Sequence, residues 1–138
     1  MITAFLDTNI VIDFYQKREP FFTHASAIFT LAKNQNIVVA VSAITIVNCF
    51  YLLKKYYDRS MLYEKMSALC QLACVTEIND SSVQEALKQE WPDFEDCVQY
   101  ISASNNGYDY IVTRNVSDYI HSSIPVLMPE DFLNTITE

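Results

Sequence analysis

The chain has 138 residues, 51% of them hydrophobic, which is enough for one domain with a real core and argues against intrinsic disorder. Asn48, Lys54 and Lys55 interrupt the most apolar stretch, and the N-terminus lacks an export-signal pattern, so we expect a single cytoplasmic domain over residues 1–138 with no membrane span. The net charge of −8 argues against broad electrostatic adhesion to nucleic acid.

Short apolar runs alternate along the chain with segments of helical periodicity. We predict strands at residues 2–6, 37–41, 73–78, 110–113 and 125–128, and helices at residues 9–16, 21–35, 43–57, 59–71, 80–90, 94–106 and 130–136. Strands that alternate with helices favour parallel pairing through right-handed crossovers. The sequence therefore predicts an α/β fold.

Residue types at the expected boundaries agree with these ranges. Pro20 opens the second helix, Ser42 can cap the third, and Pro129 precedes the last. Gly107 is the only glycine, and it falls where a left-handed residue would end the helix at 94–106. A chain with one glycine cannot form a G-x-G-x-x-G turn or a P-loop, which excludes nucleotide cofactors held in those ways.

Four cysteines lie in the expected helices and core, without the close pairs of a disulfide or zinc framework: Cys49, Cys70, Cys74 and Cys97. Cys70 and Cys74 could share a metal on one helical face, but only His24 and His121 are available to complete such a site. Reduced, partly buried thiols are the simpler interpretation.

A polar group follows the first predicted strand. Asp7, Thr8 and Asn9 bring a carboxylate, a hydroxyl and an amide out of the sheet together. Open parallel sheets bind ligands beyond the carboxyl ends of their strands, which makes Asp7 a candidate catalytic and metal-binding residue, with Thr8 and Asn9 lining the pocket. The alternative is that Asp7 only caps the helix that begins near Asn9.

A second acidic group, Asp-Phe-Glu-Asp at residues 93–96, opens a later helix. Asp93 has the position of an N-cap, and its offset to Asp96 resembles a capping box, so capping alone could explain Asp93. Asp96 is the weaker reciprocal cap because its side chain is short. We therefore interpret Asp96 as a catalytic metal ligand and Asp93 as a residue that lines the pocket.

The third group follows the strand at 110–113. Arg114, Asn115 and Asp118 supply a cation, an amide and a carboxylate on a short loop. Loop residues at the carboxyl end of a strand are well placed for binding, so all three are candidate site residues, and the cation of Arg114 could bind a polyanionic substrate. A turn rich in Asn, Ser and Asp is equally typical of plain chain reversal.

Asn48 lies on an apolar stripe of the helix at 43–57, with Ile44, Tyr51 and Leu52 as its helical neighbours. An unsatisfied amide there would cost about 1 to 3 kcal/mol, so Asn48 must find hydrogen-bond partners. Both a core asparagine and the lining of a polar pocket satisfy that requirement.

Carboxylates forced together repel one another, and a bound cation relieves the repulsion. Oxygen ligands without a cluster of His or Cys favour Mg²⁺ or Mn²⁺ over zinc. Such an ion can stabilise the charge that develops on a phosphate, so hydrolysis of a phosphodiester is the expected chemistry.

With these groups in order, the chain resembles the PIN-domain family, and particularly the VapC-like toxins of bacterial toxin–antitoxin pairs. The resemblance rests on residues 5–9 (Phe-Leu-Asp-Thr-Asn), 93–96 (Asp-Phe-Glu-Asp) and 113–119 (Thr-Arg-Asn-Val-Ser-Asp-Tyr), and it extends through most of the chain. It implies a three-layer sandwich with a central, mostly parallel sheet flanked by helices.

The resemblance also implies a function. It implies a Mg²⁺- or Mn²⁺-dependent endoribonuclease with RNA as substrate, in which Asp7, Asp96 and Asp118 hold the metal and Asn115 orients water or phosphate. It further implies a homodimer and a basic antitoxin whose segment covers the acidic pocket.

One position departs from the family pattern, because Asn48 stands where an acidic residue is usual. Losing a charge near the metal would weaken its binding, which predicts feeble or conditional nuclease activity. The alternative is a degenerate PIN domain that binds RNA or a protein with little or no cleavage. A receiver-type signalling domain fits less well, since only Asp7 follows the first strand and no lysine occurs beyond Lys88.

Overall fold

Five parallel strands form the central sheet of the computed structural model, which describes residues 1–137. The strands lie in the spatial order β3-β2-β1-β4-β5, and their bounds are β1 (Thr3–Leu6), β2 (Val38–Ser42), β3 (Cys74–Thr76), β4 (Tyr110–Val112) and β5 (Val126–Leu127). Every neighbouring pair is parallel, and Phe5 of β1 lies opposite Ala40 of β2 and Ile111 of β4. The predicted α/β class is confirmed, with a sheet that is parallel throughout.

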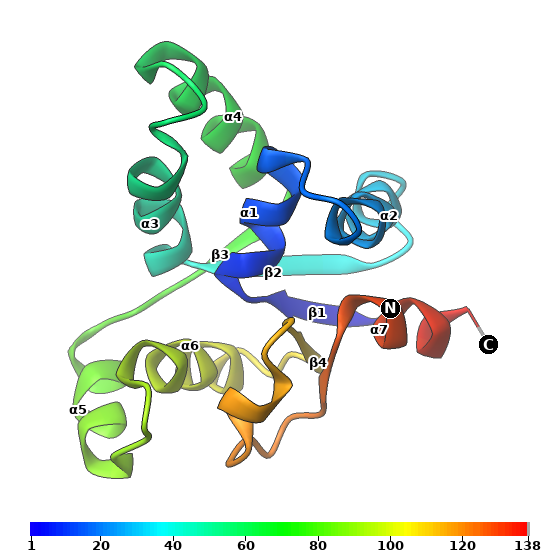
Figure 1. The fold of residues 1–138 in the computed structure, drawn as a ribbon. Helices are drawn as coiled ribbons and strands as arrows, with labels where there is room; N and C mark the ends of the chain where they lie inside the picture. Colours follow the sequence, from blue (N-terminus) through cyan, green and yellow to red (C-terminus); the bar gives the residue numbers. More distant parts are fainter. Residues whose placement is uncertain (138) are drawn as a thin grey trace.

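Helices cover both faces of this sheet and give the predicted three layers. They are α1 (Thr8–Gln16), α2 (Phe21–Lys33), α3 (Ala43–Leu53), α4 (Arg59–Leu72), α5 (Asp80–Gln89), α6 (Phe94–Asn105) and α7 (Pro129–Ile136), with a short 3-10 helix, η1 (Val116–Tyr119), after β4. Figure 1 shows α1 to α4 on one side of the sheet and α5 and α6 on the other. Within the described residues, no helix is long and apolar enough to span a membrane.

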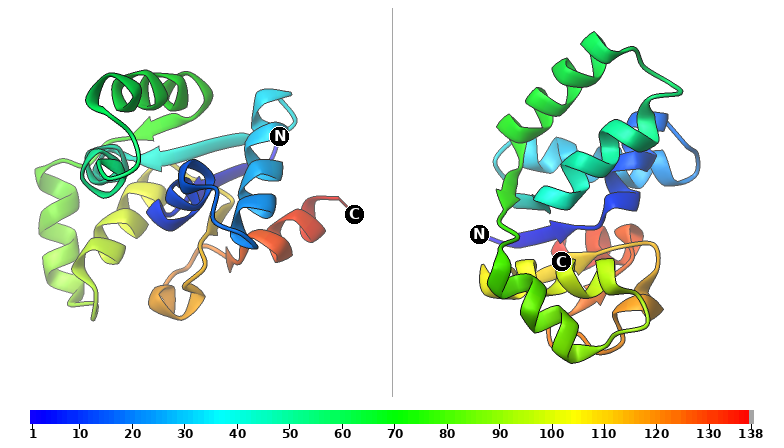
Figure 2. Two further views of the ribbon diagram at one scale, coloured as in Figure 1. Left: turned by 45° about the horizontal axis from the view of Figure 1, so that its top comes forward. Right: turned by 90° about the vertical axis from the view of Figure 1, so that its left-hand side faces the viewer.

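Each face of the sheet has its own hydrophobic core. Successive side chains of a strand point to opposite faces, so Ala4 and Leu6 pack with α1 to α4 and α7, whereas Phe5 packs with α5, α6 and Tyr119. Phe5 and Leu6 are both completely buried. The two further views in Figure 2 show the sheet between these helical layers.

Several boundaries follow the capping residues that the sequence contains. Ser42 caps α3, because its hydroxyl accepts a hydrogen bond from the Thr45 amide at 3.2 Å. Gly107 has φ of +70°, in the left-handed region expected after α6. The predicted helix at 43–57 was too long: α3 ends at Leu53, whose carbonyl accepts from the amides of two later residues in a turn.

The last helix also begins one residue earlier than predicted. Pro129 is its first residue rather than the residue before it, a position where the missing proline N–H has no helical partner to lose.

The strand order determines where a ligand can bind. After β1 the chain returns to β2 on one side of it, while β4 lies on the other side, so the connections diverge at the carboxyl ends of β1 and β4. A crevice forms at such a switch point. Asp7 follows β1 and Thr113 follows β4, which places both residues at this crevice.

Candidate functional site

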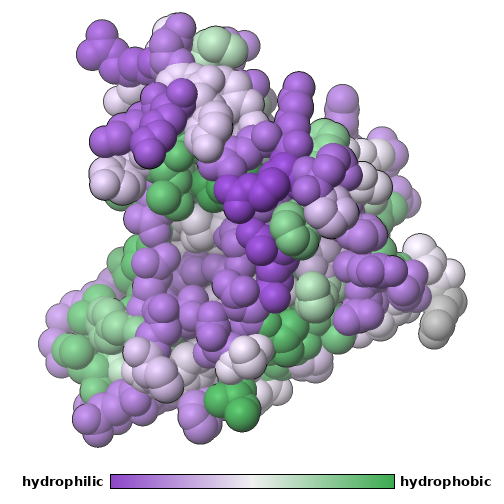
Figure 3. All heavy atoms as spheres, viewed as in Figure 1, coloured by the Kyte–Doolittle hydropathy of each residue, from purple (hydrophilic) through white to green (hydrophobic). Residues whose placement is uncertain are grey.

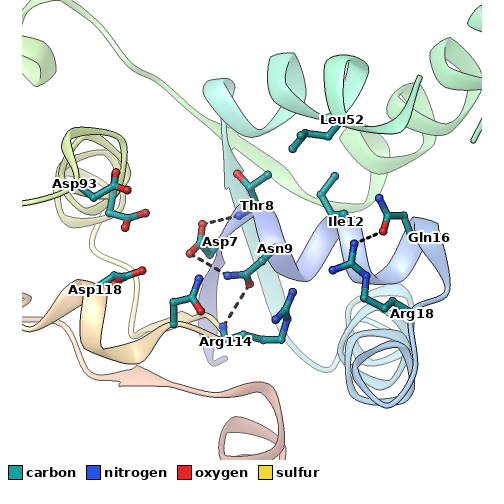
Figure 4. A pocket seen from close by; sticks show the side chains of 12 residues that line it. Asp7, Thr8, Asn9, Ile12, Gln16, Arg18, Leu52, Asp93, Arg114 and Asp118 are labelled. Carbon is teal, nitrogen blue, oxygen red and sulfur yellow. Dashed lines mark hydrogen bonds between the residues drawn. The ribbon is translucent and has the colours of Figure 1, made fainter. Parts of the chain in front are cut away.

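A pocket of about 390 Å³ lies at the carboxyl ends of β1 and β4. Its lining contains eight of the nine residues that the sequence nominated: Asp7, Thr8, Asn9, Asp93, Asp96, Arg114, Asn115 and Asp118. Ile12, Gln16, Arg18 and Leu52 complete it. Figure 3 shows hydrophilic side chains across the middle of the molecule, seen as in Figure 1, and Figure 4 shows Asp93, directly before α6, and Asp118 of η1 across the pocket from Asp7.

Asp7 is the buried anchor of the pocket, and it also caps α1. Its Oδ1 accepts from the Thr8 amide at 2.7 Å, and its Oδ2 accepts from the Thr113 hydroxyl at 2.8 Å. Asn9 Nδ2 lies 3.2 Å from Thr113 Oγ1 and 3.5 Å from Asp7 Oδ2. Burial raises the pKa of Asp7 despite these donors, because desolvation outweighs them. Capping and a functional role therefore coexist in one residue.

Gln99, which the sequence analysis did not nominate, links Asp7 to the neighbouring elements. It is completely buried on α6, and its Nε2 donates to Asp7 Oδ1 at 2.9 Å. Its Oε1 accepts from the hydroxyls of Ser42 at 2.8 Å and Thr45 at 3.0 Å. Thr45 in turn shares a hydrogen bond of 2.7 Å with the Thr8 hydroxyl. One signal could have identified Gln99: it lies three residues after Asp96, on the same face of a helix.

Asp96 lies half-buried at the start of α6, and its carboxylate is not used as a cap. Asp93 makes the cap, with its Oδ1 accepting from the Asp96 amide at 3.0 Å. The side chain of Asp96 instead faces Tyr119, whose hydroxyl is 3.5 Å from its Oδ1. Burial first, and then the charges of Asp7, Asp93 and Asp118, raise the pKa of Asp96 to about 7.

Tyr119 is a second residue that the sequence analysis missed. It is 2% exposed, and burial together with the adjacent Asp7 and Asp96 raises the pKa of its phenol well above its ordinary value. The hydroxyl therefore stays protonated and donates to the carboxylates beside it. Its place directly after Asp118 was the available signal.

Asp118 lies in η1 and Asn115 lies directly before η1, and both line the pocket. Both are exposed, and the Asp118 amide donates to the Asn115 carbonyl at 3.0 Å, which closes the turn. The Asn115 amide donates to Thr113 Oγ1 at 3.0 Å, so the turn is joined to the hydroxyl that also binds Asp7. The loop expected after β4 is therefore a compact turn that carries an amide and a carboxylate into the pocket.

Arg114 lines the pocket but is paired inside the protein. Its Nε lies 2.5 Å from Asp13 Oδ2 and its guanidinium carbon lies 4.2 Å from the centre of the Phe21 ring. Asp13 is only 1% exposed and has a second, longer contact of 4.0 Å with Arg18. Sequence reasoning missed Asp13, because an acidic residue within a helix is usually exposed.

A comparison with models of known protein families places this chain in one of them. Residues 3–117 match the family model of the PIN domain. The chain belongs to the PIN-domain family. A comparison with curated proteins gave no match.

Solved structures share the fold of this PIN domain. A toxin–antitoxin complex from Klebsiella pneumoniae is 25% identical, with a TM-score of 0.66 over 91% of this chain and 97% of that chain. VapBC-1 from nontypeable Haemophilus influenzae is 18% identical, with a TM-score of 0.67 over 94% and 99% of the two chains. Mycobacterium tuberculosis VapC20, a Sarcin-Ricin loop cleaving toxin, is 14% identical, with a TM-score of 0.61 over 78% and 86%.

The PIN-domain pocket has the donor chemistry of a site for a hard divalent cation. Asp7, Asp96 and Asp118 face one pocket with carboxylate oxygens, and the pKa of Asp96 is raised by the charges of both others. Among residues 1–137, no three acidic, histidine or cysteine side chains gather closely enough to form a ready metal-binding group. Mutual repulsion opposes such close approach of carboxylates, and a cation between them would reverse it. Carboxylate oxygens of this kind are the donors that a hard divalent cation prefers.

Asn48 differs from the other nominated residues of the PIN domain. It was expected to line the pocket, but the pocket lining does not include it, because its amide is turned to α6. There Asn48 Nδ2 donates to Glu95 Oε1 at 3.0 Å. Glu95 was not nominated, although it lies directly before Asp96.

Proposed function

We propose that the protein is a divalent-metal-dependent endoribonuclease that hydrolyses RNA phosphodiesters. The observation that carries the proposal is the convergence of Asp7, Asp96 and Asp118, which are far apart in sequence, on one pocket of a PIN domain. In this proposal the three carboxylates hold Mg²⁺ or Mn²⁺. The bound ion would polarise a phosphate oxygen and lower the pKa of a water molecule.

The other pocket residues have supporting roles in the proposed reaction. Asn115 is exposed in the lining, where its amide can orient the phosphate or the attacking water. Arg114 brings positive charge to a lining rich in carboxylates, and its pairing with Asp13 fixes the direction of the guanidinium. Gln99 and Thr113 hold Asp7 in one orientation by donating to both of its oxygens.

We further propose that the protein is the toxin of a toxin–antitoxin pair and forms a homodimer. The toxin role is supported by the fold shared with the toxin–antitoxin complex from Klebsiella pneumoniae and with VapBC-1, whereas the homodimer is what the family resemblance implies. An antitoxin with a basic segment would complement an acidic pocket on a chain with a net charge of −8.

The test is cleavage of a structured RNA by the purified protein with Mn²⁺, compared with chelator and with Asp7→Asn. We expect metal-dependent cleavage by the wild type and none by the variant, because Asp7 is both ligand and centre of the hydrogen-bond network. Cleavage that survives in Asp7→Asn would indicate a contaminating nuclease. If the wild type binds Mn²⁺ but cleaves no RNA, the proposed ribonuclease activity is wrong.

That last result would instead support a second candidate, a PIN domain that binds RNA or a protein partner without cleavage. The observation that favours it is the neutral Asn48 at a position where an acidic residue is expected. A gel-shift titration with the same RNA separates the two candidates. The second candidate predicts that the RNA is bound but that no cleavage products form.

A further inference from the structure

A hydrogen bond joins α3 to α6 beside the pocket. Asn48 Nδ2 on α3 donates to Glu95 Oε1 in the first turn of α6, at 3.0 Å across 47 positions of sequence. Asn48 lies between Thr45 and Leu52 on one face of α3, at the spacing that aligns side chains along a helix. Thr45 is hydrogen-bonded to Thr8 and Leu52 lines the pocket, so this face of α3 follows the pocket wall.

The carboxylate of Glu95 is held close to other negative charges. Partial burial raises the pKa of Glu95, the charges of Asp93 and Asp7 raise it further, and the hydrogen bond from Asn48 lowers it. Glu95 in turn adds to the field on Asp96. In every ion pair found among residues 1–137, the acidic partner is Asp13. Glu95 therefore has no Lys or Arg as an ion-pair partner.

This arrangement is unusual for an ordinary surface glutamate. A side chain in the first turn of a helix can turn outward to water, where repulsion from Asp7 and Asp93 would be weaker. Glu95 is exposed and lies just outside the pocket lining, but Asn48 holds its carboxylate within reach of the charges of Asp93 and Asp7 with a neutral donor. A neutral donor fixes the position of a carboxylate without cancelling its charge, and the charge remains available to a cation.

We infer that Glu95 is a further carboxylate of the divalent-cation site and that Asn48 is the residue that positions it. The inference rests on the proposed function, because it concerns the same cation. Position 48 lacks the usual acidic residue, and in this inference Glu95 of α6 supplies the carboxylate instead. The hydrogen bond from Asn48 holds that carboxylate in place. Asn48 is then compatible with a competent metal site.

Calorimetric titration of the whole chain with Mn²⁺ tests this inference without relying on activity. Glu95→Gln keeps the shape and the contact with Asn48 but removes the charge, and we expect it to weaken Mn²⁺ binding by about tenfold or more. Glu64→Gln is the matched control, because Glu64 is an exposed glutamate on α4, away from the pocket lining. Binding by Glu95→Gln that equals wild type, or a loss that Glu64→Gln shares, would overturn the inference.

Two further variants test the role of Asn48. Asn48→Ala should weaken Mn²⁺ binding less than Glu95→Gln does, since the charge remains but loses its orientation. The exchange variant Asn48→Glu/Glu95→Gln keeps the net charge at −8 and should recover binding relative to Glu95→Gln. If Asn48→Ala binds as tightly as wild type, or if the exchange recovers nothing, position 48 does not share the ion and its assigned role is wrong.

Asp7→Asn distinguishes this inference from the proposed function. If the wild type binds no Mn²⁺, or if Asp7→Asn binds it equally well, the proposed metal site and the role of Glu95 are both overturned. If binding depends on Asp7 but not on Glu95, only the inference about Glu95 is overturned.

Discussion

Asp96 is the residue at which pH and metal should compete most directly. Its pKa of about 7, raised first by burial and then by Asp7, Asp93, Asp118 and Glu95, leaves it partly protonated near neutral pH. None of the groups that shift the pKa of Asp96 is positively charged. A metal must displace the remaining proton, so Mn²⁺ binding should tighten as pH rises through 7.

The same shift predicts how stability depends on pH in the absence of metal. The pKa of an unfolded Asp is about 3.9, so a folded value near 7 gives a contribution that is present below pH 4 and is lost as pH rises toward 7. Asp96→Asn does not titrate. The melting temperature of the wild type minus that of Asp96→Asn should therefore fall between pH 4 and pH 7. A difference that stays constant with pH would contradict the raised pKa.

Sequence could predict some residues of the site but not others. Asp7, Asp96 and Asp118 each lie at a strand end or a helix start, where local pattern already indicates a turn toward the crevice. Gln99 and Tyr119 lie within buried faces of the fold. Their role depends on which neighbour the tertiary structure brings to them, and no local spacing specifies that neighbour.

At the scale of elements, the turn after β4 is tied to α1 through a buried ion pair. Arg114 Nε and its terminal nitrogen lie 2.5 Å and 3.2 Å from the two oxygens of Asp13, in a bidentate contact. The Arg114 amide also donates to Asn9 Oδ1 at 3.3 Å. These contacts fix the position of Asn115 relative to the start of α1.

Removal of Arg114 should therefore destabilise the fold. Arg114→Met leaves Asp13, 1% exposed, without its close partner, and should lower the free energy of unfolding by about 3 to 5 kcal/mol. Asp13→Leu/Arg114→Met removes both charges and should cost less than the single change. Urea unfolding measures both.

Arg18→Met is the control for that series. Arg18 is 48% exposed and lies 4.0 Å from Asp13, so its loss should cost less than about 1 kcal/mol. Equal losses in Arg114→Met and in the double variant would show that the buried charge of Asp13 does not need its partner.

At the scale of the whole molecule, sequence predicted the kinds and order of the elements and their three-layer, parallel class, but not the order of the strands in the sheet. Apolar runs and helical periodicity gave all five strands and all seven α-helices among residues 1–137, because burial on a sheet or a helix face imposes those periods. The order β3-β2-β1-β4-β5 depends on contacts between distant segments. The early end of α3 at Leu53 arises from a turn that the apolar pattern does not mark.

The two cores share one sheet, which predicts a single cooperative unit. Each strand sends alternate side chains to both faces, so neither core can lose its packing without disturbing β1, whose Leu6 and Phe5 belong to different cores. Phe132 of α7 is fully buried in the core that contains Leu6. Trp91, the only tryptophan, belongs to the other core and reports on it by fluorescence.

Phe132→Ala tests whether the faces unfold together. The substitution should lower the free energy of unfolding by about 3 to 5 kcal/mol, because it removes a buried ring and leaves a cavity. In a single domain over residues 1–138, Trp91 fluorescence should report the same reduced urea midpoint as circular dichroism of the helices, although Trp91 lies in the opposite core. A fluorescence transition that keeps the wild-type midpoint while the circular dichroism shifts would mean that the two faces unfold separately, and the prediction of one domain would then be wrong.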